Sequence, residues 1–142
     1  MYAMHRIILI IFTSLILFAS SSMANSYITV PNTGQRLYSW DGEFLMKPNT
    51  GQRLYRWDGT YIMKPTTGER LFKWDGEYLM KPATGERLLK WDGNFITKPN
   101  TGERLFKFDG EYVTKPNTGE RIFSIDGAIS IPLIIALVGG LI

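Results

Sequence analysis

The sequence predicts an all-β fold: an antiparallel meander of about twelve short strands, twisted or curled. Three observations predict it. A unit of 17 residues repeats six times between Ser26 and Gly127, with nothing inserted between the copies. Every copy contains two turn signals. The segments between the turns hold about five residues, alternate as strands do and are too short for helices.

The first turn signal is Asp-Gly, which recurs from Asp41-Gly42 to Asp126-Gly127. Glycine accepts a positive φ without steric cost, so this pair between aromatic and β-branched residues is typical of a hairpin. The second is Pro-x-Thr-Gly, which recurs from Pro31 to Gly119. Proline presets the opening φ, and the glycine closes a four-residue loop in the left-handed region. The two turn signals therefore predict one hairpin and one further turn in each repeat.

A β-solenoid is the alternative architecture. It would stack each residue on the residue 17 positions later, which places the arginines of the repeat in one column at ~4.8 Å spacing. Like charges directly opposite one another destabilise a sheet. The meander instead sets lysine opposite glutamate across the Pro-x-Thr-Gly loops, at Lys64 and Glu69, Lys81 and Glu86, Lys98 and Glu103, and Lys115 and Glu120. Charge therefore favours the meander.

The odd period of the repeat requires one extra residue per unit, because equivalent residues would otherwise point to opposite faces of the sheet. We expect this residue in a three-residue Trp-Asp-Gly loop whose glycine takes the left-handed bulge position. The glycines concerned are Gly42, Gly59, Gly76, Gly93 and Gly110. In that register Tyr38 faces Phe44 and Leu37 faces Leu45. Tyr55 then shares a face with Phe44 and Tyr61, while Leu54 shares the opposite face with Leu45 and Ile62.

The N-terminal segment has the layout of a secretory signal peptide over residues 1–24. A weakly basic start is followed by the apolar run 7–19, and small residues precede a cleavage point after Ala24. The remaining chain consists of the repeat domain, residues 25–127, and an apolar tail, residues 128–142. We therefore expect a protein that is secreted or held at the cell surface or envelope.

The tail carries no charged residue. As a helix its fifteen residues would reach only about 22 Å, short of a hydrocarbon core of ~30 Å. Two interpretations stay open. The tail is either a closing strand that packs on the last hairpin, or a membrane anchor, processing signal or oligomerisation segment.

Composition argues against catalysis. The chain has no cysteine, and its single histidine, His5, lies in the predicted signal peptide. Polar residues recur in ladders, whereas an active site needs a unique constellation of groups, so we expect no enzyme. We expect no metal or cofactor, because the Asp-Gly carboxylates would lie ~9.6 Å apart. Loss of Arg6 leaves 15 Lys and Arg against 13 Asp and Glu, and without a basic run we expect no nucleic-acid partner.

Rows of aromatic and arginine side chains are the candidate binding residues. Exposed, they would stack on sugar rings, grip an anionic polymer or dock a second copy; buried, they form the core. The candidates are Trp40, Trp57, Trp74, Trp91, Tyr38, Tyr55, Tyr61, Tyr78, Arg53, Arg70 and Arg87.

The leading functional hypothesis is a structural or adhesive surface protein whose regular ladders bind a glycan or cell-envelope polymer, or assemble with further copies. A carbohydrate-binding module is the second hypothesis. The third is a membrane-active secreted peptide, in which residues 128–142 contact the membrane. The apolar side chains concerned in membrane contact or assembly are Leu133, Ile134, Ile135, Leu137 and Val138.

Overall fold

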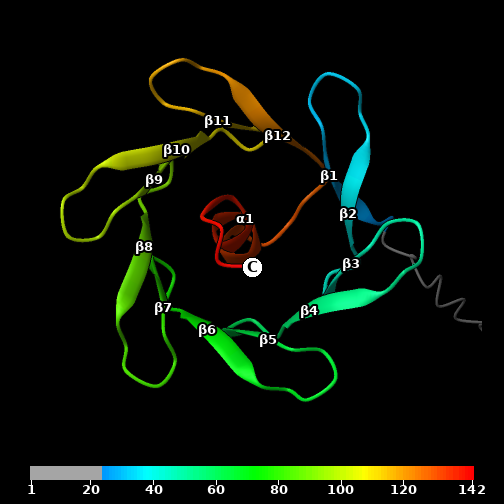
Figure 1. The fold of residues 1–142 in the computed structure, drawn as a ribbon, viewed down its shortest axis with the longest axis horizontal. Coiled ribbons are helices and arrows are strands. Elements are labelled where there is room, and N and C mark those ends of the chain that lie inside the picture. Colours follow the sequence, from blue (N-terminus) through cyan, green and yellow to red (C-terminus); the bar gives the residue numbers. More distant parts are fainter. Residues whose placement is uncertain (1–23) are drawn as a thin grey trace, which may run out of the picture.

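The computed structural model describes residues 24–142, so the predicted signal peptide lies outside the described residues except for Ala24. Twelve antiparallel strands form a closed barrel around one central helix (Figure 1). Consecutive strands pair with one another, and β1 closes the ring by pairing with β12. The meander is therefore confirmed. The solenoid is wrong, because all the strand pairs are antiparallel.

Each repeat contributes one hairpin with a short first strand and a longer second strand. The short strands are β1 (Ser26–Thr29), β3 (Phe44–Met46), β5 (Tyr61–Met63), β7 (Tyr78–Met80), β9 (Phe95–Thr97) and β11 (Tyr112–Thr114). The long strands are β2 (Arg36–Trp40), β4 (Arg53–Trp57), β6 (Arg70–Trp74), β8 (Arg87–Trp91), β10 (Arg104–Phe108) and β12 (Arg121–Asp126). We call these hairpins arms 1 to 6. Their Pro-x-Thr-Gly loops point away from the barrel axis (Figure 1).

The turns at Asp-Gly lie further along the chain than the sequence predicts. Trp40 pairs with Leu45 and Ser39 with Met46, so Tyr38 does not face Phe44 and Leu37 does not face Leu45. The backbone N–H of Asp41 donates to the carbonyl of Phe44 at 3.4 Å. Gly42 and Glu43 therefore form a two-residue loop, in place of the expected three-residue loop. Positive φ at the glycines is confirmed, with 99° at Gly42 and similar values at its equivalents.

The extra residue of each unit lies in the long strand instead of the turn. Ile62 pairs with Phe72 and Met63 with Arg70, which leaves Leu71 as a bulge between them. The same register shift occurs in every arm, at Leu37, Leu54, Leu71, Leu88, Leu105 and Ile122. A bulge bends its strand and increases the local twist. In each hairpin the bulge therefore lies between the regular strand pairing of the barrel and the outward-pointing Pro-x-Thr-Gly loop.

This register divides the aromatic residues between the two faces of the sheet. Tyr55 pairs with Leu45, whereas Phe44 pairs with Arg56. The expectation that Tyr55 shares a face with Phe44 and Tyr61 is therefore wrong, since a shift of one residue moves side chains to the opposite face. The core side of the sheet carries the Trp row and the row of Tyr38 and Tyr55, and the outer side carries the row of Phe44, Tyr61 and Tyr78.

The core lies on the barrel axis. One residue of each short strand is at most 1% exposed: Ile28, Leu45, Ile62, Leu79, Ile96 and Val113. These side chains form one hydrophobic cluster with Leu133, Ile134, Ile135 and Ala136 of helix α1 (Ile131–Val138). Side chains alone fill a barrel of about eight strands. A barrel of twelve strands has a wider interior, and the helix fills it.

The C-terminal tail is therefore part of the folded body. Of the two interpretations left open for residues 128–142, the closing strand is wrong, because β12 closes the barrel and the tail returns into its centre as a helix (Figure 1). Within residues 24–142 no helix is long and apolar enough to cross a membrane.

One position shows how a single helix fits inside a six-fold ring. The row that contains Tyr38 and Tyr55 is aromatic in five arms and carries Leu89 in arm 4. A Cβ added at Gly139, at the end of the helix, would lie 2.6 Å from Cδ1 of Leu89. The helix end thus packs against the one arm that has a smaller side chain in this row.

Candidate functional site

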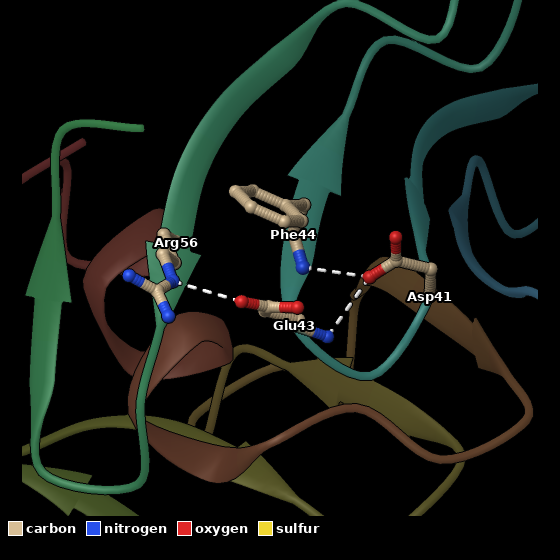
Figure 2. A network of polar contacts seen from close by, with 4 residues as sticks. All are labelled: Asp41, Glu43, Phe44 and Arg56. Carbon is tan, nitrogen blue, oxygen red and sulfur yellow. Dashed lines mark hydrogen bonds and ion pairs between the residues drawn. The ribbon is translucent and has the colours of Figure 1, made fainter. Parts of the chain in front are cut away.

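The Asp-Gly turns hold their shape through a carboxylate. Oδ1 of Asp41 accepts the backbone N–H groups of Glu43 at 2.9 Å and Phe44 at 2.7 Å (Figure 2). Asp58, Asp75, Asp92 and Asp109 accept the corresponding pairs of N–H groups. This explains why aspartate precedes the glycine in these turns.

The same bonds help to lower the pKa of Asp58, Asp75, Asp92 and Asp109, because they stabilise the ionised carboxylate. At Asp75 the largest cause is the backbone hydrogen bond from Tyr78. The corresponding bond is also the largest cause at Asp92 and Asp109. Burial, which raises the pKa, is the largest influence at Asp58, but two backbone N–H groups and two arginines outweigh it. Among residues 24–142 no three His, Cys, Asp or Glu residues cluster as metal ligands would.

The predicted arginines lie on the outer face of the arms. Their guanidinium carbons stand over the outer aromatic rings: Arg53 over Phe44 at 3.9 Å, Arg70 over Tyr61 at 4.0 Å and Arg87 over Tyr78 at 4.0 Å. The stack recurs in every arm. At exposed sites such contacts contribute about 0.5–1 kcal/mol each. The structure therefore brings Arg70 together with Tyr61 and Arg87 together with Tyr78, on the face of the sheet opposite the tryptophans.

The four predicted tryptophans belong to the barrel wall. Trp40 is 5% exposed and is part of the core, and Trp57, Trp74 and Trp91 are half-buried against it. Tyr38 and Tyr55 pack against the same cluster. The core alternative for these rings is thus the arrangement observed, and a ligand role for the tryptophans stays a prediction.

The predicted tail residues also contact the barrel. Leu133, Ile134 and Ile135 are buried, and Leu137 and Val138 are half-buried against the same cluster. Their observed role is to fill the core.

A groove between neighbouring arms was not predicted from the sequence. Its volume is about 550 Å³, and arms 1 and 2 supply most of its lining. The lining residues are Gln35, Arg36, Leu37, Tyr38, Lys47, Pro48, Asn49, Thr50, Leu54 and Phe123. We call it the arm 1–2 groove.

An equivalent groove lies between arms 5 and 6, with a volume of about 340 Å³. Its lining residues are Glu103, Arg104, Leu105, Phe106, Lys115, Pro116, Asn117 and Thr118, which occupy the positions of Gln35 to Tyr38 and Lys47 to Thr50 four repeats later. We call it the arm 5–6 groove. The two grooves are thus built alike, from the bulged strand of one arm and the loop of the next.

The two grooves differ in charge. Lys115 of the arm 5–6 groove forms an ion pair with Glu120 at 2.6 Å, and Glu103 forms one with Lys98 at 2.6 Å. In the arm 1–2 groove the lining residues include Arg36 and Lys47 but no carboxylate. The sequence signal for this difference is glutamine at positions 35 and 52, where arms 3 to 6 have glutamate.

A comparison with family models places most of the ring in one family. A family model described as a 6-fold beta flower protein matches residues 29–136, a stretch that runs from the end of β1 into the central helix. No curated protein and no solved structure matched the chain.

Proposed function

The chain belongs to the 6-fold beta flower family, and from this premise we propose that it is an exported, non-catalytic binding protein of the cell surface. Its inter-arm grooves hold glycan chains of the cell envelope. One observation carries the proposal: equivalent residues form a groove at two places in the ring, between arms 1 and 2 and between arms 5 and 6.

The chemistry of the groove suits a sugar. Small-molecule sites are concave and mostly apolar, with a few polar groups that fix orientation. Leu37 and Leu54 supply apolar surface, and the Tyr38 ring offers a partly exposed aromatic surface. The amide of Asn49 and the hydroxyl of Thr50 lie on the facing loop. An aromatic ring beside hydrogen-bonding groups contacts both the apolar faces and the hydroxyls of a sugar ring.

Repetition of the groove supports an adhesive role. Several weak sites on one rigid body bind a polymer with an avidity far above that of one site. A polysaccharide supplies many equivalent sugars, as the ring supplies equivalent grooves. Repetition also argues against catalysis, because a ladder of identical turns does not provide one unique set of catalytic groups.

The test is binding of the chain beginning at residue 25 to envelope polysaccharides, by glycan array and titration calorimetry. The variant combines Tyr38→Leu with Phe106→Leu, one change in each groove. Leucine keeps an apolar side chain at both positions, and thermal unfolding of the variant checks that the barrel is retained before binding is compared. We expect binding to weaken about tenfold, while the control Thr60→Ala, at an exposed turn, leaves it unchanged. Absence of polysaccharide binding, or equal losses in variant and control, would contradict the proposal.

A further inference from the structure

We propose that the arm 1–2 groove selects acidic glycans, whose sugars carry carboxylates. This inference rests on the proposed function and assigns the ligand class of one groove. The arm 1–2 groove is the larger of the two, with two cationic side chains and no carboxylate among its lining residues.

Lys47 carries most of the argument. The corresponding lysines of arms 3 to 6 form ion pairs of 2.6–2.7 Å with glutamate across the loop. Lys47 instead faces Gln52, and within residues 24–142 no carboxylate lies within ion-pair distance of its ammonium group. Its charge is therefore free for a ligand.

The backbone of this loop does not differ from the others. The N–H of Lys47 donates to the carbonyl of Gln52 at 2.9 Å, and the N–H of Lys64 donates to that of Glu69 at 2.9 Å. Thr50 also accepts the N–H of Gln52 at 3.2 Å, as Thr67 accepts that of Glu69 at 3.3 Å. Glutamine in place of glutamate thus changes the charge of the groove and leaves the loop fold unchanged.

Arg36 supplies a second, oriented cation. Its guanidinium carbon lies 3.8 Å from the centre of the Tyr27 ring, so the group rests over the face of that ring. Stacking occupies the flat face of a guanidinium and leaves the N–H groups along its edge, which match the two oxygens of a carboxylate. Within the described residues Arg36 makes no ion pair. Arg36 and Lys47, from neighbouring arms, thus line one apolar groove.

The experiment compares two polymers and two variants. The ligands are polygalacturonate and its methyl ester, which share a backbone and differ in the charge of the carboxyl group. The variant Gln52→Glu supplies the carboxylate that arms 3 to 6 already have, so its fold is expected to be retained. We expect polygalacturonate to bind, its ester to bind at least about tenfold more weakly, and Gln52→Glu to weaken binding of the acid about tenfold.

The matched control is Glu69→Gln, the reverse exchange in arm 3, which is expected to leave binding of polygalacturonate undiminished. Binding of the acid should also weaken as salt rises. Equal binding of both polymers, or no effect of Gln52→Glu, overturns the acidic selectivity and leaves the proposed function standing. If the protein binds other envelope glycans but not polygalacturonate, the acidic selectivity is likewise overturned and the proposed function stands. Absence of binding to any glycan overturns both.

Discussion

At the scale of single residues, the aspartate of the first five Asp-Gly turns explains much of the repeat. Its carboxylate accepts two backbone N–H groups that the two-residue loop leaves unpaired by backbone carbonyls (Figure 2). Buried or turn N–H groups without an acceptor are costly, so a side-chain acceptor at this position is favoured in copy after copy. The charge of the carboxylate then links the turns to pH.

Acid should destabilise the barrel through these turns. The pKa of Asp75, Asp92 and Asp109 is lowered from an ordinary value of 3.8, so each group contributes stability that is present above that value. The contribution is lost as pH falls through the lowered pKa of the folded state. We expect the urea midpoint, followed by tryptophan fluorescence, to stay level from pH 7 to about 5 and to fall below about 4. The triple change to asparagine should flatten this acid slope. An unchanged slope in the variant would contradict the assignment to these three groups.

The arm 1–2 groove also shows what single residues reveal and conceal. The glutamines at positions 35 and 52 are visible in the sequence, and so is their difference from the later glutamates. The effect of these glutamines on the charge of the groove depends on which residues they face. The sequence alone does not show this, because the groove is formed by strands and loops of adjacent arms. The predicted lysine–glutamate pairs at Lys64 and Lys81 are confirmed, because a loop of fixed length determines them.

At the scale of elements, the repeat predicts how many strands there are better than where each side chain points. The odd period and the turn signals require one extra residue per unit. The structure contains that residue, as the bulge in each long strand. Its position was wrong because the Asp carboxylate allows a two-residue loop, and because Leu71 resembles any other strand residue in the sequence. The consequence is large, since a shift of one residue exchanges the inner and outer faces.

The central helix could not be predicted from its own residues. Isolated helices of eight residues are not stable in water, and Ile131–Val138 is also rich in residues that favour strands. The helix is stable because it is buried inside the barrel. That burial exists only when the surrounding strands form a closed ring. Length and propensity describe the segment alone and do not include that burial.

Arm 4 should be sensitive to the size of the side chain that meets the end of this helix. Leu89 is 6% exposed and lies against Gly139, whereas the same row is aromatic in the other arms. We expect Leu89→Phe to destabilise the protein by about 1–3 kcal/mol, because the added volume displaces the helix end. The same exchange at the half-buried bulge residue Leu71 is the control and should cost less. Chemical denaturation of both variants measures the difference, and equal stabilities would contradict the contact.

At the scale of the whole molecule, closure of the ring protects the strand edges of a chain that has no cysteine and therefore no disulfide. The pairing of β1 with β12 removes the free strand edges that promote aggregation. A hydrogen bond that we call the latch lies beside this pairing: the N–H of Ala128 donates to Oγ of Ser26 at 3.0 Å, and a Cβ at Gly127 would clash with that oxygen. The first strand thus anchors the chain as it turns toward the central helix.

Export is expected to leave this first strand intact. Cleavage after Ala24 makes Asn25 the first residue and keeps Ser26, with which β1 begins. Cleavage only a few residues later would remove the latch and part of the closing pair. Mass spectrometry of secreted protein should therefore show a chain that begins at Asn25. Recovery of intact Met1 in a membrane fraction would contradict the signal peptide.

Deletion of one whole repeat should test whether the ring is specified as a ring. Removal of residues 60–76 keeps every remaining turn and lysine–glutamate loop, but takes two of the twelve strands. Barrel diameter grows roughly linearly with strand number, so a barrel of ten strands is too narrow for helix α1. Either the helix is expelled and exposes its apolar side chains, or the ring stays open and exposes strand edges. We therefore expect thermal unfolding to lose its cooperativity and the chain to aggregate.

The control replaces residues 60–76 with the sequence of residues 43–59, which preserves the number of strands and should unfold cooperatively. If the five-repeat chain unfolds with the same midpoint and cooperativity as the full chain, the helix does not set the number of arms.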